Sequence, residues 1–181
     1  MNYFKERIIN DLRKAKKETI RIGVIGAGTA GCWIAYYLLT KRKFKNVTVI
    51  DHDKVTEETI QNEGHTIYTR FDLGKQKVTA LERKIKNECP EANLVIYRKK
   101  IRPSMSYDEL NEMLGDCTII IWAVDTIEGL KATEHPFMLE RIGIAPGIDP
   151  NGRGGHVAVY IPMTTPCQRC TLGLDSCDQK A

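Results

Sequence analysis

The glycines near the start of the chain have the spacing of a nucleotide-binding turn. Residues 26–31 read GAGTAG, follow the apolar run 20–25 and open the apolar-rich stretch 29–39. A strand, a glycine turn and a helix in that order place backbone N–H groups against a nucleotide phosphate. We therefore expect Gly26, Gly28 and Gly31 to form a phosphate-binding turn, although a glycine string alone also occurs in purely structural turns.

An aspartate at the end of the next β-like run strengthens this interpretation. Asp51 follows the run 47–50 and comes twenty residues after Gly31. A nucleotide-binding βαβ unit places at this spacing the carboxylate that accepts hydrogen bonds from ribose hydroxyls. Strand, glycine turn, helix and ribose acid together favour nucleotide binding over a structural turn.

Alternating β- and α-type patterns position these residues. A helix at 106–114 begins with a capping box formed by Ser106 and Glu109. The run 117–124 is continuously apolar, which is typical of a strand buried on both faces. Together these patterns predict an α/β fold with a Rossmann-like, doubly wound and mostly parallel sheet. Expected strands are 21–25, 47–50, 93–97, 117–124 and 142–145, and expected helices are 3–17, 29–40, 76–87, 106–114 and one from 126.

Two segments depart from this alternation. Residues 51–73 are polar with little periodicity, and a loop of that length is usually functional or mobile. After the GRGG at 152–155, apolar and polar residues mix in 156–161, which predicts one or more added C-terminal antiparallel strands.

The remaining candidate residues fall in an order that resembles a known family. The motifs are the glycine turn, Asp-x-Asp-x-Val at 51–55, Gly-x-x-Lys at 74–77 and Cys-x-x-Cys at 167–170. They resemble those of the ThiF/MoeB family, ATP-dependent activators of ubiquitin-like and sulfur-carrier proteins. The resemblance runs from about residue 20 to the end of the chain.

This resemblance implies an activity and a set of roles. Members join ATP to the C-terminal glycine carboxylate of a small β-grasp protein, which makes an acyl-adenylate. The implied partner is thus a ubiquitin-like or sulfur-carrier protein ending in Gly-Gly, and the implied assembly is a homodimer. Lys77 takes the position of the phosphate-binding lysine, Asp125 that of the magnesium carboxylate and Asp51 that of the ribose acid, with Asp53 and Thr126 beside them.

Each of these residues also has a plainer interpretation. Lys77 can be a lysine on a helix surface. Asp125 can cap the helix that begins at Thr126, a role that aspartate favours. Asp53 fits a loop or capping acid better than a catalyst.

One stretch departs from the family pattern. The family carries Asn-x-x-Arg-Gln in the loop after Asp-x-Asp, and its arginine contacts the ATP phosphates. Here Asn62 can hold the asparagine position, but the arginine position falls near Glu63 or Gly64. Arg70 can substitute, or a second subunit can supply the cation from an N-terminal helix. Arg7 and Arg13 are the candidates on that helix.

Three cysteines crowd the C-terminal end. Cys167 and Cys170 have the spacing of half a structural zinc site, which the family completes with a second pair farther on. The resemblance therefore implies that this chain is truncated relative to the family. Redox chemistry and chance remain alternatives for the lone pair. Cys177 resembles the cysteine that accepts the acyl group or sulfur in some members, and otherwise is a third zinc ligand or a plain loop cysteine.

The overall composition and net charge limit the classes of function that fit the chain. Hydrophobic residues make up 42% of the chain and charged residues 28%, with a net charge of +4. Residues 1–20, with six Lys and Arg against three Asp and Glu, supply most of that charge, so it argues weakly for nucleic acid. No window approaches a membrane span and the N-terminus lacks a signal-peptide core, so we expect a cytoplasmic protein.

We divide the chain into an N-terminal amphipathic helix (1–18), a nucleotide-binding adenylation domain (19–165) and a cysteine-containing tail (166–181). Two other functions compete with adenylation. An NAD-dependent oxidoreductase can use the same glycine turn, but it leaves Lys77, Asp125 and the cysteines unexplained. A degenerate relative that binds a nucleotide or partner without turnover fits the missing arginine.

Overall fold

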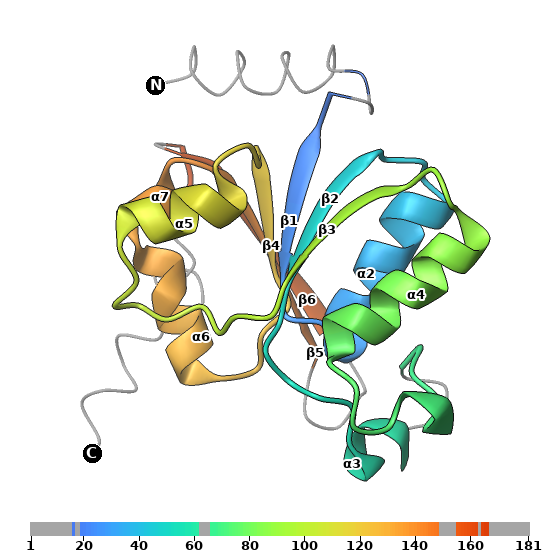
Figure 1. Ribbon diagram of the computed structural model, residues 1–181. Helices are drawn as coiled ribbons and strands as arrows, with labels where there is room; N and C mark the ends of the chain where they lie inside the picture. The colour runs from blue at the N-terminus through green and yellow to red at the C-terminus, as the bar shows by residue number, and fades with distance from the viewer. Residues whose placement is uncertain (1–15, 17–18, 62–65, 149–154, 163, 167–181) are drawn as a thin grey trace, which may run out of the picture.

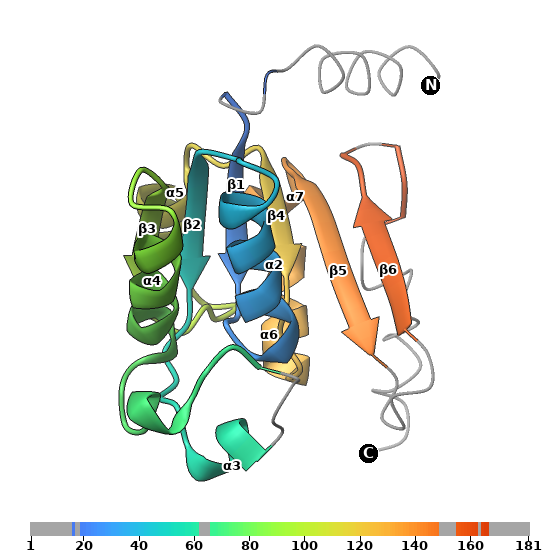
Figure 2. The same cartoon turned by 90° about the vertical axis from the view of Figure 1, so that its right-hand side faces the viewer.

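A single six-stranded sheet forms the centre of the molecule (Figures 1 and 2). The computed structural model describes residues 16, 19–61, 66–148, 155–162 and 164–166. Strand order is β3-β2-β1-β4-β5-β6; the first five strands are parallel and β6 is antiparallel to β5. The predicted doubly wound sheet with an added antiparallel strand is confirmed. The strands are β1 (Arg21–Ile25), β2 (Asn46–Ile50), β3 (Asn93–Tyr97), β4 (Ile119–Trp122), β5 (Ile142–Ile148) and β6 (Gly155–Tyr160).

Helices cover both faces of the sheet. On one face lie α2 (Thr29–Thr40) and α4 (Lys77–Glu88), and on the other lie α5 (Tyr107–Leu114), α6 (Ile127–Lys131) and α7 (Pro136–Leu139) (Figure 1). The short helix α3 (Glu57–Gln61) and the 3-10 turns η1 (Arg70–Asp72) and η2 (Ala132–Glu134) complete the described elements. Figure 2 shows β5 and β6 continuing the sheet beside α2.

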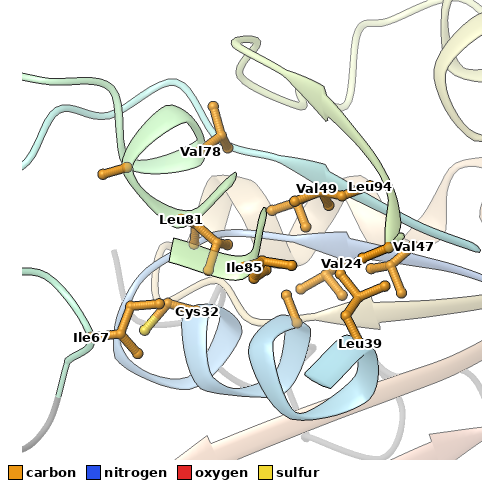
Figure 3. Close-up of a cluster of buried hydrophobic side chains, with 14 of the residues drawn as sticks. Val24, Cys32, Leu39, Val47, Val49, Ile67, Val78, Leu81, Ile85 and Leu94 are labelled. Atoms are coloured by element: carbon orange, nitrogen blue, oxygen red, sulfur yellow. The ribbon is translucent and has the colours of Figure 1, made fainter. Parts of the chain in front are cut away.

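Two apolar clusters hold the layers together, because alternate strand residues face opposite sides. Val24 and Val49 pack with α2 and α4 through Leu39, Leu81 and Ile85 (Figure 3). On the other face, a second cluster of strand residues packs against Phe137 of α7, which is fully buried. The central strands are therefore buried on both faces, which explains their continuous apolar runs.

The predicted capping box is present at the start of α5. The Ser106 hydroxyl accepts from the Glu109 backbone N–H at 3.2 Å, and Glu109 accepts from the Ser106 N–H at 2.9 Å. These two bonds satisfy backbone groups that a helix start leaves unpaired, so α5 begins where the sequence predicts.

The prediction of one long polar loop over 51–73 was wrong. It contains α3 and η1, and Asp72 of η1 is almost fully buried. Its carboxylate accepts from the Thr69 N–H and hydroxyl, each at 3.0 Å, and from Arg83 at 2.5 Å. This buried and hydrogen-bonded carboxylate holds η1 against α4 without any hydrophobic periodicity in the sequence.

The described cysteines, Cys32, Cys89 and Cys117, are buried and free, as expected of structural residues. Among the described helices, none combines the length and apolarity needed to cross a bilayer. Apart from Lys16, the predicted helix over 3–17 lies outside the described residues, as does the tail from 167 onward, and the domain boundaries remain predictions.

Candidate functional site

A cleft of about 580 Å³ lies at the carboxyl edge of the parallel strands. This size falls in the range of small-molecule sites, about 300–1,000 Å³. β1 and β4 are neighbours whose connections run over opposite faces of the sheet, so the cleft lies at the switch point where open α/β sheets bind ligands. Its lining includes Gly26 and Gly28 after β1, residues 51–53 after β2, Lys77 of α4, Lys99 and Lys100 after β3, and Asp125 and Thr126 after β4.

The three predicted glycines have three different positions in the turn after β1. Gly26 has φ +92°, and a Cβ there would lie 2.3 Å from the Ala123 carbonyl oxygen. A Cβ on Gly31 would lie 1.9 Å from the Gly26 carbonyl oxygen, so this glycine lets α2 approach the turn. Gly28, the N-cap of α2, lines the cleft with no atom within 4 Å of where its Cβ would be. The turn thus leaves open space at the start of a twelve-residue helix, where a phosphate is favoured.

Asp51 connects the glycine turn to the loop after β2. Its side chain is buried, and one oxygen accepts from the Ala27 N–H at 2.6 Å. Its other oxygen accepts from the Asp53 N–H, also at 2.6 Å. An ionised carboxylate has about four acceptor positions, so two remain for other donors such as ribose hydroxyls.

Lys77 reaches the cleft because a short backbone pairing holds the start of α4 beside the loop after β2. The Lys77 N–H donates to the Asp53 carbonyl at 2.9 Å, and its Nζ donates to the Asp53 carboxylate at 3.3 Å. Only 14% of the Lys77 side chain is exposed, compared with 52% for Asp53. Lys77 is therefore not a freely solvated helix-surface lysine, and Asp53 is the loop acid that orients it.

Asp125 lies just beyond the end of β4. The next residue, Thr126, is the N-cap of α6, because its hydroxyl accepts from the Gly129 N–H at 3.1 Å. Asp125 is exposed, lines the cleft, and has no hydrogen bond or ion pair with any residue that the structure describes. An unpaired carboxylate oxygen is a ligand that Mg²⁺ prefers, so this residue fits a magnesium ion that accompanies a phosphate.

Three basic side chains of the cleft were missed in the sequence. His52 Nε2 lies 3.3 Å from an Asp53 oxygen, and Lys99 and Lys100 follow β3. Lys100 donates to Glu128 of α6 at 2.6 Å, and this bond holds the pKa of Glu128 below its usual value. The sequence signal for His52, Lys99 and Lys100 was their position shortly after two runs predicted to be parallel strands. The carboxyl ends of parallel strands lie at the same edge of a sheet.

Other predicted residues are not brought to the cleft. Arg70 is exposed in η1 and is not among the cleft-lining residues. Gly31 packs against the Gly26 carbonyl and is not among the cleft-lining residues. Asn62, Cys167, Cys170 and Cys177 lie outside the described residues, as do Glu63 and Gly64.

A mostly parallel sheet with helices on both faces and a glycine turn after its first strand defines a fold of the Rossmann type. The chain belongs to the ThiF family, whose model matches residues 4–180. It is 27% identical over 175 residues to the NEDD8-activating enzyme E1 catalytic subunit of Arabidopsis thaliana, covering 90% of this chain and 37% of that protein.

Solved structures agree on the fold. E. coli MccB with ATP has a TM-score of 0.66 at 18% identity, covering 90% of this chain and 48% of MccB. E. coli tRNA N6-threonylcarbamoyladenosine dehydratase, TcdA, in complex with AMP has a TM-score of 0.52 at 22% identity, covering 62% of this chain and 44% of TcdA. The chain spans less than half the length of each of these three proteins.

Proposed function

We propose that the protein adenylates a carboxylate with ATP, and that its substrate is the C-terminal carboxylate of a ubiquitin-like or sulfur-carrier protein ending in Gly-Gly. The observation that carries this proposal is the meeting of Gly28, Asp51, Lys77 and Asp125 at one cleft. These groups come from four different elements, and each matches a part of ATP or its metal ion.

The reaction needs neither an oxidant nor a covalent enzyme nucleophile. A carboxylate oxygen of the substrate attacks the α-phosphorus of ATP, the bond from that phosphorus to the β-phosphate oxygen breaks, and pyrophosphate leaves. In phosphoryl-type transfers the protein contributes mostly positioning and charge stabilisation. Lys77 would stabilise the negative charge on the phosphates, while Asp51 would hold the ribose. Asp125 would bind Mg²⁺, which neutralises phosphate charge.

Membership of the ThiF family and the named relatives support this proposal. One relative is named as a NEDD8-activating E1 subunit, and the structures of MccB and TcdA contain ATP and AMP. An NAD-dependent hydride transfer would use the glycine turn and Asp51, but it gives no role to Lys77 or to the unpaired Asp125. A nucleotide triphosphate with a metal ion gives both a role.

Further parts of the proposal concern residues outside the cleft. We propose a cytoplasmic homodimer in which Arg7 or Arg13 of one subunit supplies the cation missing from the loop of the other. In the tail, Cys167 and Cys170 would bind zinc with ligands from elsewhere. The Cys177 thiol would accept the acyl group from the acyl-adenylate, forming a thioester as AMP leaves. Sedimentation analysis of the mass and metal analysis under reducing conditions test the dimer and the zinc site separately.

Exchange of labelled pyrophosphate into ATP tests the proposed reaction. The substrates would be purified ubiquitin-like proteins that end in Gly-Gly, with the same proteins lacking those two glycines as controls. Exchange that depends on both the protein and the terminal glycines supports the proposal. Binding of ATP without exchange for any such substrate would favour the non-catalytic alternative, and tight NAD binding without ATP binding would favour the oxidoreductase.

A further inference from the structure

A buried tyrosine that the proposed reaction does not use contacts the glycine turn. Tyr68 lies in the segment between α3 and η1, and only 5% of its surface is exposed. Its hydroxyl donates to the Ala27 carbonyl oxygen at 2.6 Å. Tyr68 is not among the residues that line the cleft, so it would act on a bound nucleotide only through the turn.

Ala27 is held from both sides. Its N–H donates to Asp51 at 2.6 Å, and its carbonyl accepts from Tyr68 at 2.6 Å. The first bond fixes the peptide between Gly26 and Ala27, and the second fixes the peptide between Ala27 and Gly28. Two successive peptide planes of the turn are thereby fixed, although glycines flank Ala27 and would otherwise let these planes rotate.

The second of these planes contains the N–H of Gly28. In a planar trans peptide the C=O and the following N–H point in opposite directions. Because the Ala27 carbonyl points toward buried Tyr68, the Gly28 N–H points away from it. Gly28 lines the cleft, so this direction suits a donor to a bound phosphate.

Tyr68 is itself packed in the apolar core cluster on the face of the sheet that α2 and α4 cover. Its N–H donates to the Thr66 hydroxyl at 3.4 Å, and that hydroxyl lies 3.9 Å from the Cys32 sulfur in the first turn of α2. Burial, aided by the nearby Cys32, Asp51 and Asp72, raises the pKa of the Tyr68 phenol well above its usual value. The hydroxyl therefore keeps its proton and can donate to the Ala27 carbonyl at neutral pH.

We propose that Tyr68 is a positioning residue for nucleotide phosphates, because its hydroxyl orients the Ala27–Gly28 peptide so that the Gly28 N–H faces the cleft. This inference rests on the proposed nucleotide binding and names the group that prepares the turn for phosphate. It assigns Tyr68 no contact with ribose or base. Loss of the hydroxyl should thus weaken ligands with phosphates and leave adenosine unaffected.

Calorimetry with ATP and with adenosine tests this role in the Tyr68→Phe variant, which keeps the ring in the core. We expect ATP to bind about tenfold more weakly, since one orienting hydrogen bond is lost, while adenosine binds as in the wild type. Tyr36→Phe is the matched control: Tyr36 lies on α2, the helix that follows the turn, and the variant loses only the 2.6 Å hydrogen bond from its hydroxyl to Glu88 of α4. That variant should bind both ligands normally.

Each outcome decides between the two proposals. If wild type binds no ATP, nucleotide binding fails and the role of Tyr68 fails with it. If wild type binds ATP, and Tyr68→Phe changes the affinities for ATP and adenosine by the same factor or changes neither affinity, only the role of Tyr68 is overturned.

If Tyr68→Phe does not fold, hydrogen exchange of the Gly28 amide in the wild type tests the proposed direction of this N–H instead. The amide should exchange readily in the free protein, gain protection with ADP and gain none with adenosine. Protection before any ligand is added would overturn the proposal.

Discussion

Lys77 and Asp53 are joined twice, once through their backbones at 2.9 Å and once through their side chains at 3.3 Å. This double link brings the first residue of α4 to the loop after β2, although the two residues are 24 positions apart. The lysine therefore reaches the cleft with a fixed backbone and a side chain that Asp53 orients. Such preorganisation is useful where charge develops during a reaction, because little rearrangement is then needed.

Replacing Lys77 by alanine should lower pyrophosphate exchange about a hundredfold or more, since losing a cation that contacts developing phosphate charge costs about 3 kcal/mol. The measurement is the exchange rate at saturating ATP with an active carrier protein. Lys45→Ala is the control, because Lys45 is exposed and lies before β2, at the opposite edge of the sheet. Equal exchange by wild type and Lys77→Ala would leave the lysine without a role in the reaction.

Removing the Asp51 carboxylate should abolish or greatly weaken ATP binding for two reasons. The proposed ribose acceptor is lost, and the buried N–H of Ala27 and the N–H of Asp53 each lose their 2.6 Å acceptor. Calorimetry of Asp51→Ala with ATP and magnesium checks this expectation. Asp116→Ala is the control, because that exposed aspartate pairs with Arg21 at the amino end of β1. Unchanged ATP affinity in Asp51→Ala would mean that the cleft holds nucleotide some other way.

The succession of strands and helices along the chain and the glycine turn were predictable because each depends on local signals. Apolar runs, the capping box at Ser106 and the glycines that permit φ +92° and close packing are all visible in the residues themselves. The 3-10 turn η1 was not predictable, because it depends on a buried carboxylate, Asp72, whose partner Arg83 lies eleven positions on in α4.

The residues of the cleft were only partly predictable, because some of them meet through the pairing of strands that are far apart in the sequence. Lys77 and Asp125 occupy positions that the family resemblance implies. Lys99 and Lys100 reach the cleft because β3 runs parallel to β2, so that both strands end at the same edge. The alternative that Asp125 caps α6 was also open in the sequence. Side-chain geometry decides it, since the Thr126 hydroxyl makes the capping bond.

Asp72 provides a stability prediction that is separate from function. Asp72→Asn should lower the free energy of unfolding by about 2–4 kcal/mol, because an amide nitrogen then faces the donors of Thr69 and Arg83 in a buried position. Urea unfolding followed by circular dichroism measures the change. Asp108→Asn on the exposed face of α5 should shift the unfolding free energy by no more than about 0.5 kcal/mol. A similar small effect at Asp72 would mean that η1 is held mainly by other contacts.

Cys32 should make stability depend on alkaline pH. Burial raises the pKa of its thiol above the usual value of 9.0, against weaker opposing hydrogen bonds. Near and above pH 9 the unfolded chain therefore binds fewer protons at this residue than the folded chain, and stability falls as pH rises. The contribution is fully present below that range and decreases by up to about 1 kcal/mol by pH 9.5.

Urea unfolding of wild type and Cys32→Ala at pH 7.5 and 9.5 isolates this contribution, because the variant lacks the titrating thiol. The pH range stays below the usual tyrosine pKa of 10.0, so Tyr68 adds little to the difference. Cys117, whose pKa burial also raises, should contribute equally to both proteins. The variant will start less stable because it loses packing, so the comparison is between the two changes with pH. Stability should fall less from pH 7.5 to 9.5 in Cys32→Ala than in wild type, and equal changes would contradict the raised pKa of this thiol.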